Sequence, residues 1–312
     1  MREFTVLSII LFYIFTILTD CYILRDILSY CRYRKKAAVW SYSVSSVLFW
    51  GLVTVIAFWP AARESSSLIP LMWMIYTYFS VYVSKLLYVV FSAVGRLFRS
   101  KRKGRRVNYG VYAGIPLSLV AFIFMWWGAL FTRNEIVVEN VTVVSGRLPQ
   151  KFNGYRIVQF SDAHVGTWGN DTSFVSRLVD RINSLDPDLI VFTGDVVNRE
   201  TSEMEPFLSV LSRLKARDGV YSVLGNHDYG DYMDWSFPSE RDSNNALMRM
   251  WQRQIGWRML NNGHTFISRQ GDSIALIGVE NWGEPPFRQY GRLAEAYSGN
   301  SESASNLRDG RF

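Results

Sequence analysis

Cysteine and histidine are scarce in this chain of 312 residues. It contains two cysteines, Cys21 and Cys31, and three histidines. Because both cysteines lie near the N-terminus, the C-terminal half holds no thiol, which excludes a disulfide framework or a thiolate metal site there. Two of the three histidines fall inside short polar motifs of that same half. Any metal site there therefore needs carboxylate, imidazole or amide ligands.

Charge is also scarce in much of the N-terminal part, where four apolar stretches stand out. They are Phe4–Leu24, Ala38–Trp59, Leu68–Val94 and Val111–Phe131. Each is long enough to cross a hydrocarbon core, which takes about 20 helical residues. Tryptophan and tyrosine gather near their ends, as in an aromatic belt. We therefore predict a four-helix transmembrane region over residues 1–132, followed by a soluble α/β domain over residues 133–312.

Two basic loops predict how the chain lies in the membrane. They hold 12 of the 34 lysine and arginine residues of the chain, whose net charge is +7. The first loop holds Arg25, Arg32, Arg34, Lys35 and Lys36, and the second holds Arg96, Arg99, Lys101, Arg102, Lys103, Arg105 and Arg106. The positive-inside rule places both loops in the cytoplasm, so that the soluble domain is extracytoplasmic. Because these loops adjoin membrane segments and carry no recognition motif, we expect contact with membrane lipids and no nucleic-acid binding.

Three polar motifs of the C-terminal half each follow an apolar run. They are Asp162-Ala163-His164, Gly194-Asp195 and Gly225-Asn226-His227-Asp228. Open α/β sheets gather ligands at the carboxyl ends of their strands. Carboxylate, imidazole and amide groups collected there suit divalent metal ions. One aspartate able to bridge two ions, with separate ligands for each, is the plan of a two-metal hydrolytic site.

The order and spacing of these motifs resemble the calcineurin-like metallophosphoesterase family, whose pattern is D-x-H, then G-D, then G-N-H-[D/E]. The gaps are 33 residues from Asp162 to Asp195 and 31 from Asp195 to Asn226, and a strand–helix unit fits in about 30 residues. The resemblance covers approximately residues 133–290. It implies an αββα sandwich of mixed sheets.

The resemblance also assigns metal ligands. Asp162 and His164 would hold a first divalent ion, Asp195 would bridge both ions, and Asn226 would hold the second. Two such ions lower the pKa of a shared water and clamp the phosphoryl oxygens. Manganese, iron and zinc all accept this ligand set, so the pair is not identified.

Two neighbouring residues receive roles beside the metals. His227 would face the substrate, where it could protonate the leaving oxygen or stabilise the developing charge. Asp228 would either orient His227 or shape its loop. Gly194 and Gly225 would allow tight turns at the strand ends.

Periodicity predicts the elements between the motifs. Expected strands are an edge strand at Glu135–Val144, core strands at Tyr155–Phe160, Leu189–Thr193 and Val220–Leu224, and a hairpin of Thr265–Ser268 with Ser273–Val279. Expected helices follow Asp171-Thr172-Ser173 and cover Glu203–Lys215 and Ala246–Ile255. The tail Ser298–Phe312 is polar and is expected to be disordered.

The family's two later motifs, an isolated histidine after a further strand and G-H-x-H, are not found. His264 does not complete the second, because Phe266 stands where its second histidine would be, and we interpret His264 as a turn residue. The chain therefore resembles a C-terminally truncated enzyme, with weak metal binding expected.

Three functions compete. The first is a membrane-anchored phosphoesterase that hydrolyses phosphate esters, including lipid-linked ones, with a metal-activated water. The second is a catalytically inactive, truncated protein of the same fold that acts as a binding module. The third is a transporter or channel with an accessory domain, which would need polar or charged groups inside the membrane. Apart from Lys85 and the helix-breaking Pro116 the apolar stretches offer few, which favours anchoring.

Overall fold

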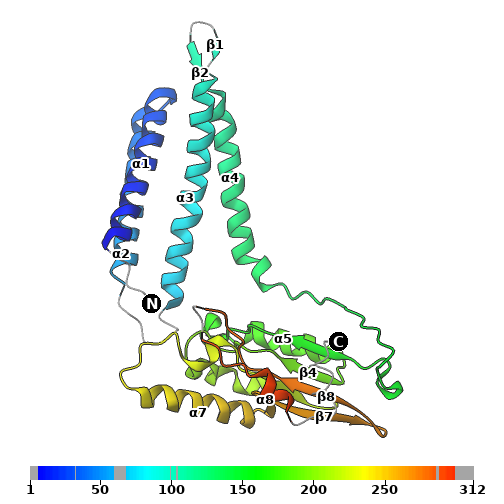
Figure 1. The fold of residues 1–312 in the computed structure, drawn as a ribbon. Coiled ribbons are helices and arrows are strands. Elements are labelled where there is room, and N and C mark those ends of the chain that lie inside the picture. The colour runs from blue at the N-terminus through cyan, green and yellow to red at the C-terminus, as the bar shows by residue number, and fades with distance from the viewer. Residues whose placement is uncertain are drawn as a thin grey trace. The chain divides into compact units, whose positions relative to one another are not determined.

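The computed structural model describes residues 6–31, 33–59, 68–98, 100–102, 105–285 and 288–298. Its contacts divide the chain into two compact units, with the boundary between Glu135 and Ile136. The first unit is mainly helical and the second has an α/β fold (Figure 1). Phe4, Arg32, Arg99 and Lys103 of the predicted membrane region, and nearly all of the predicted disordered tail, lie outside the described residues.

The first unit contains long helices at the four apolar stretches. They are α1 (Val6–Tyr30), α2 (Lys35–Ala57), α3 (Leu68–Leu97) and α4 (Tyr109–Leu130). A hairpin of β1 (Ser100–Arg102) and β2 (Arg105–Val107) lies between α3 and α4, which run side by side (Figure 1). Among the described residues, α2, α3 and α4 provide stretches long and apolar enough to cross a membrane, whereas α1 does not qualify. The span predicted for α1 thus remains a prediction.

A buried carboxylate on α1 connects the first three helices. Asp20 Oδ1 accepts hydrogen bonds from Tyr42 Oη and Lys85 Nζ, both at 2.7 Å. Its Oδ2 accepts from Trp50 Nε1 at 3.0 Å and from Tyr82 Oη at 2.8 Å. These donors come from α2 and α3, so that one side chain links α1 to both neighbours. Such a carboxylate can lie among apolar helices because its oxygens are paired and hydrogen-bonded.

A second carboxylate, Asp26, repeats this arrangement near the end of α1. It accepts a hydrogen bond from Tyr88 Oη at 3.1 Å, and it also contacts the Ser92 hydroxyl and the Arg96 guanidinium, all on α3. Asp20 lies within the apolar stretch Phe4–Leu24, so the expectation that these stretches hold little charge beyond Lys85 is wrong there, whereas Asp26 and Arg96 lie outside the predicted stretches. Charges of both signs occur inside the helical unit, and they pair with one another.

A four-stranded parallel sheet forms the centre of the second unit. Its strands are β3 (Ile157–Phe160), β4 (Leu189–Phe192), β5 (Val220–Ser222) and β6 (Trp257–Met259), in that order. Side chains alternate between the two faces of a strand. In β4, Ile190 and Phe192 enter one hydrophobic cluster, while Leu189 and Val191 contribute to another. Both faces of the sheet are consequently covered.

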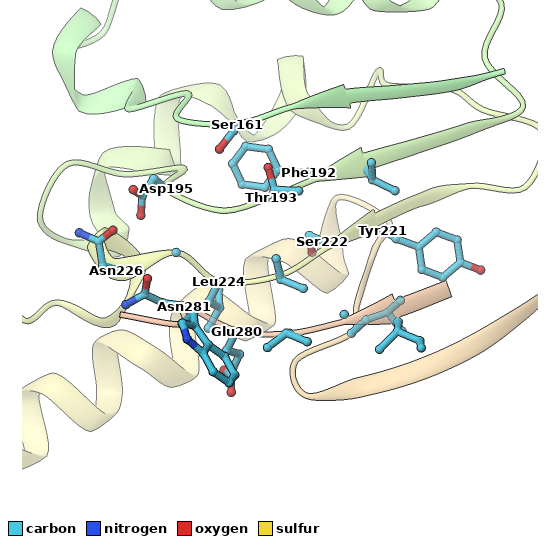
Figure 2. Close-up of a pocket in the computed structure, with 18 of the residues that line it drawn as sticks. Ser161, Phe192, Thr193, Asp195, Tyr221, Ser222, Leu224, Asn226, Glu280 and Asn281 are labelled. Atoms are coloured by element: carbon cyan, nitrogen blue, oxygen red, sulfur yellow. The ribbon is translucent and has the colours of Figure 1, made fainter. Parts of the chain in front are cut away.

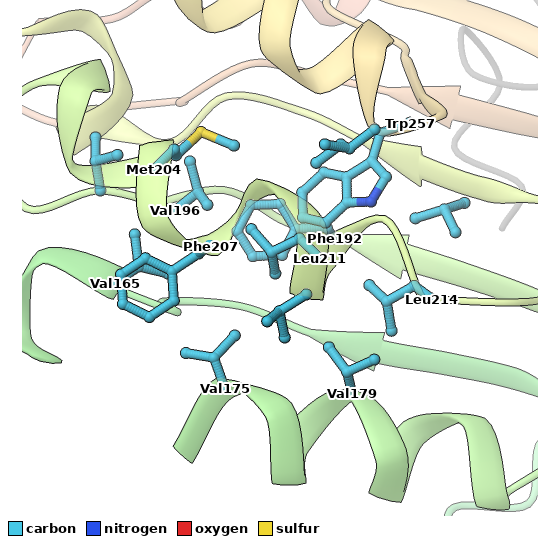
Figure 3. Packing of buried hydrophobic residues seen from close by; sticks show 14 of the residues in the cluster. Val165, Val175, Val179, Phe192, Val196, Met204, Phe207, Leu211, Leu214 and Trp257 are labelled. Carbon is cyan, nitrogen blue, oxygen red and sulfur yellow. The ribbon is translucent and has the colours of Figure 1, made fainter. Parts of the chain in front are cut away.

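Helices cover one face of this sheet. Val175 and Val179 of α5 (Ser173–Ser184) point toward Phe192, as Figure 3 shows. Met248 of α7 (Pro238–Gln254) belongs to the same buried cluster. The shorter helical segments of this unit are Gln150–Phe152, Val165–Trp168, Thr201–Phe207, α6 (Leu208–Leu211), Asn226–Tyr229 and α8 (Leu293–Tyr297), and Thr132–Asn134 follows α4.

A β-hairpin covers the other face. Strands β7 (Gly263–Arg269) and β8 (Asp272–Gly278) pair antiparallel, as predicted, and Ile267 and Leu276 pack with Leu189 and Tyr221 of the sheet. The unit thus has a helical layer, a parallel sheet and a hairpin layer. This agrees with the predicted fold class of a helical membrane region followed by a metallophosphoesterase-like α/β domain.

Several local predictions are wrong. The structure assigns no strand to Glu135–Val144, whose alternating valines are exposed and have no partner strand in the described part of the chain. The predicted helix Glu203–Lys215 is mostly a 3₁₀ segment followed by α6, because Pro206 cannot continue an α-helical ladder. Helix α7 begins at Pro238, eight residues before the predicted start. His264 lies in β7 rather than in a turn.

Candidate metal centre

The three polar motifs lie just beyond the carboxyl ends of β3, β4 and β5. Because these strands are parallel neighbours, their carboxyl ends meet at one edge of the sheet. Asp162, His164 and Asp195 have φ angles of 54°, 40° and 62°. Left-handed backbone is uncommon for residues other than glycine and costs about 1 kcal/mol or more at each position. Three such residues within two adjoining loops indicate that the surrounding contacts hold these loops in place.

Two glycines allow the loops after β4 and β5 to approach each other. A Cβ atom on Gly194, whose φ is 102°, would lie 2.4 Å from the backbone nitrogen of Gly225. A Cβ atom on Gly225 would lie 2.2 Å from Asp195 Oδ1. The predicted tight turn applies to Gly194, whereas Gly225 has φ of −89° and is needed for close approach alone.

One carboxylate and two imidazoles meet at this edge of the sheet. His164, Asp195 and His227 each offer a possible ligand atom, and these three atoms all lie within 4.8 Å of one another. Asp162 joins the group, since its Oδ1 is 3.7 Å from His164 Nε2. The two imidazole rings pack edge to face, with centroids 4.8 Å apart. Four of the predicted site residues are therefore brought together.

Backbone carbonyls hold both imidazoles by the same ring atom. His164 Nδ1 lies 3.0 Å from Val197 O, and His227 Nδ1 lies 2.6 Å from Asn198 O. Because a carbonyl oxygen only accepts, each ring donates through its Nδ1–H, and in the neutral ring Nε2 then offers its lone pair. This is the arrangement in which a neutral histidine binds a metal ion.

Asp228 lies behind the cluster and binds backbone instead of side chains. It is fully buried, and its oxygens accept from the backbone N–H groups of Asp195, Val196 and Gly225 at 2.8–2.9 Å. Burial raises the pKa of Asp228 to about 7, the N–H donors oppose this rise, and the charge of Asp195 adds to it. Of the two roles predicted for Asp228, these contacts correspond to shaping the loop, since Asn198 holds the His227 ring.

Asp195 has a similar backbone contact. Its Oδ1 accepts a hydrogen bond from the His227 N–H at 2.8 Å. This bond ties the loop after β4 to the loop after β5, and it leaves the second oxygen, Oδ2, for other ligands.

Asn226 lines a cavity of about 660 Å³ that Asp162 and Asp195 also line. Figure 2 shows Asp195, Asn226 and Asn281 at the same end of this cavity. Asn226 Nδ2 donates to Tyr232 Oη at 2.7 Å. The amide nitrogen is thus occupied, and the amide oxygen is the atom left for a metal ion.

The donor set fits a divalent metal centre. Neutral imidazole, carboxylate and amide oxygen are ligands shared by manganese, iron and zinc. Sequence reasoning missed Val197, Asn198 and Tyr232, which position the ligands. Val197 and Asn198 act through main-chain carbonyls, which the pattern of side chains does not reveal. Tyr232 lies in the loop after its motif, where the sequence does not distinguish it from any other aromatic loop residue. His264 lies apart from the cluster, with its Nδ1 3.0 Å from Ala296 O of α8.

Two family models match adjoining parts of the chain. Residues 2–133 match the model described as "Probable Calcineurin-like phosphoesterase, transmembrane domain", and residues 155–294 match "Calcineurin-like phosphoesterase".

Several curated proteins are similar over part of their length. A "Transmembrane protein with metallophosphoesterase domain" of Danio rerio is 28% identical over 64% of this chain and 45% of its own. The "UDP-2,3-diacylglucosamine pyrophosphatase LpxG" of Chlamydia trachomatis is 37% identical over 41% of this chain and 39% of its own. The "Uncharacterized metallophosphoesterase YkuE" of Bacillus subtilis is 39% identical over 45% of this chain and 46% of its own. The chain thus spans less than half the length of these relatives.

One solved structure also aligns, that of phosphopantetheinyl hydrolase from Mycobacterium tuberculosis. It is 18% identical over 48% of this chain and 51% of that chain, with a TM-score of 0.26. A TM-score this low does not establish a shared arrangement of elements.

Proposed function

The chain belongs to the calcineurin-like phosphoesterase family as an integral membrane protein, and we propose that it is a metal-dependent phosphoesterase. The observation that carries this proposal is the convergence of His164, Asp195 and His227 on one point beyond the strand ends. Hydrolysis of a phosphate ester requires positive charge on the phosphoryl oxygens and an activated water. Two bound divalent ions, when present, supply both.

In this proposal the residues of the site divide their tasks. Asp162 and His164 would hold one ion, Asn226 would hold the other, and Asp195 would serve both. His227 Nε2 faces the reacting group. When this nitrogen is protonated as well, the imidazolium can supply a proton to the leaving oxygen or a hydrogen bond to the phosphoryl group. The Asn198 carbonyl supports this role, because it holds the His227 ring by its other nitrogen.

The membrane region favours a substrate at the membrane surface. We propose that α1 is a fourth span beside α2, α3 and α4, and that the basic loops keep the phosphoesterase unit extracytoplasmic. A lipid-linked phosphate ester fits that location. The pyrophosphatase named among the relatives acts, by its name, on a diacylated glucosamine nucleotide, which supports the same class.

The test compares the full chain with Asp195→Asn in detergent micelles. We expect hydrolysis of bis(p-nitrophenyl) phosphate to require added Mn²⁺ and to fall by at least about 100-fold in the variant, since one of the central ligands loses its charge. Asp242→Asn, an exposed residue of α7, is the matched control and should leave the rate unchanged.

Hydrolysis that is equal in Asp195→Asn and the unaltered chain would contradict the proposal. No turnover in any sample, with normal folding, would instead favour the inactive binding module.

A further inference from the structure

A second cavity of about 340 Å³ adjoins the metal centre at Asn226, a residue that lines both cavities. It lies between the loop at residues 230–235, the first turns of α7 and the segment at residues 288–290. Its wall includes Tyr232, which accepts the hydrogen bond from Asn226 and stacks on His227 with ring centroids 4.3 Å apart. A group bound in this cavity would therefore be a direct neighbour of a group bound at the metal centre.

The charged residues of the cavity wall are two arginines and one aspartate. Arg241 Nη1 and Arg288 Nη1 lie 3.2 Å and 3.4 Å from the same oxygen of Asp231. Tyr290 Oη donates to the other oxygen at 2.6 Å. Asp231 is thus fully engaged, and among the described residues the wall has one net positive charge.

The guanidinium groups can still bind a ligand. Their side chains are 35% and 64% exposed, and each gives Asp231 a single nitrogen. Because guanidinium carries several N–H donors in a rigid fork, most remain available for a phosphate or similar anion. Asp231 fixes the direction of both groups, so that little conformational entropy is lost when an anion binds.

We propose that this cavity binds a second anionic group of the substrate, so that the preferred substrate class is a diphosphate rather than a simple monoester. The inference rests on the proposed phosphoesterase function, because it assigns the reacting phosphate to the metal centre and the neighbouring phosphate to Arg241 and Arg288. These two arginines then determine specificity through binding and take no part in bond breaking.

The test uses two phosphonates that cannot be hydrolysed. Methylenediphosphonate carries two anionic groups and methylphosphonate carries one. Their binding to the full chain in detergent with Mn²⁺ is measured by isothermal titration calorimetry. We expect methylenediphosphonate to bind at least about tenfold more tightly than methylphosphonate, since each charge-assisted contact is worth about that factor.

Variants assign that difference to the cavity. Arg241→Gln and Arg288→Gln should each weaken methylenediphosphonate binding about tenfold and leave methylphosphonate binding within about twofold. Arg253→Gln, an exposed arginine of the same helix α7, should change neither. Arg241→Lys keeps the charge, and it should retain part of the affinity if Arg241→Gln proves poorly folded.

Equal binding of methylenediphosphonate to the unaltered chain and to the folded double variant Arg241→Gln/Arg288→Gln would overturn the inference. If bis(p-nitrophenyl) phosphate were still hydrolysed in that case, the proposed function would stand and the second subsite would fail. If arginine-dependent binding occurred without any hydrolysis, the subsite would stand and the proposed function would fail.

Discussion

Asp228 shows how a residue can support the candidate metal centre from behind it. Its two oxygens collect backbone N–H groups from the loops after β4 and β5, and these loops carry Asp195 and His227. The carboxylate thus compensates main-chain donors that would otherwise be buried without partners. Its effect on the candidate metal centre is consequently indirect, through the backbone that carries Asp195 and His227.

Replacing Asp228 by asparagine tests this arrangement. The new amide group turns an N–H donor toward backbone N–H groups, and we expect the local stability to fall by about 1–3 kcal/mol. Hydrogen–deuterium exchange in the full chain should show faster exchange at residues 194–198. Asp242→Asn, which is exposed on α7, should not change exchange there. Unchanged protection in Asp228→Asn would show that the loops do not depend on this carboxylate.

At the scale of elements, Asp188 joins three strands of the second unit. It precedes β4, accepts from the Arg156 N–H next to β3 at 2.8 Å, and binds Arg217 Nη1 at 2.6 Å and Arg269 Nη1 of β7 at 3.3 Å. Burial by itself would raise the pKa of Asp188, but these bonds outweigh it and hold that pKa below the usual value of 3.8.

This lowered pKa predicts the pH dependence of stability. Because the folded state favours the charged form of Asp188, this carboxylate contributes fully to the free energy of unfolding above its unfolded-state pKa. The contribution is lost as the pH falls through its lower, folded-state pKa. At pH 7 we expect Asp188→Asn to destabilise the unit by about 2 kcal/mol. The difference should shrink as the pH falls below the unfolded-state pKa toward the lower folded-state pKa of Asp188, where its carboxyl group becomes protonated as well. Hydrogen–deuterium exchange at the β3 and β4 amides of both proteins, measured from pH 7 to pH 3, tests this prediction. A difference in protection between the two proteins that stays constant over this range would contradict the assignment.

The sequence predicted those elements in which local pattern and tertiary environment agree. Residues Leu189–Phe192 form an apolar run that only a buried strand accommodates, and β4 follows. The strand expected at Glu135–Val144 fails because alternation alone supplies no neighbour to pair with. Strand β6 (Trp257–Met259) was missed because three residues carry no measurable periodicity.

The candidate site, too, could be predicted from the sequence only in part. Motif spacing predicted that Asp162, His164, Asp195 and His227 would gather at the strand ends, because parallel strands place consecutive loops at one edge. Their roles remain predictions. The carbonyls of Val197 and Asn198 that hold both imidazoles could not be foreseen, since every residue has such a carbonyl and only the folded loop selects these two.

At the scale of the whole molecule, the proposed orientation separates two parts of the chain by the membrane. Cys31 follows α1 in the first basic loop, and Asp272 begins β8 of the second unit. In a Cys21→Ser background, we expect a membrane-impermeant maleimide to label Asp272→Cys on intact cells and Cys31 only after permeabilisation. Labelling of Cys31 alone on intact cells would reverse the orientation.

The pairing of Asp20 with Lys85 has a consequence for how the chain is made. The two residues are 65 positions apart, and a ribosome adds about 5–20 residues per second. For a time on the order of 3 to 13 seconds, therefore, α1 carries its carboxylate before the ammonium group of α3 exists. Asp26 and Arg96 are 70 positions apart, so Asp26 is without its partner for slightly longer. In the proposed topology, α1 therefore reaches its final place in the bilayer only after α3 has been made, so that its insertion is completed during helix assembly rather than during its own translation.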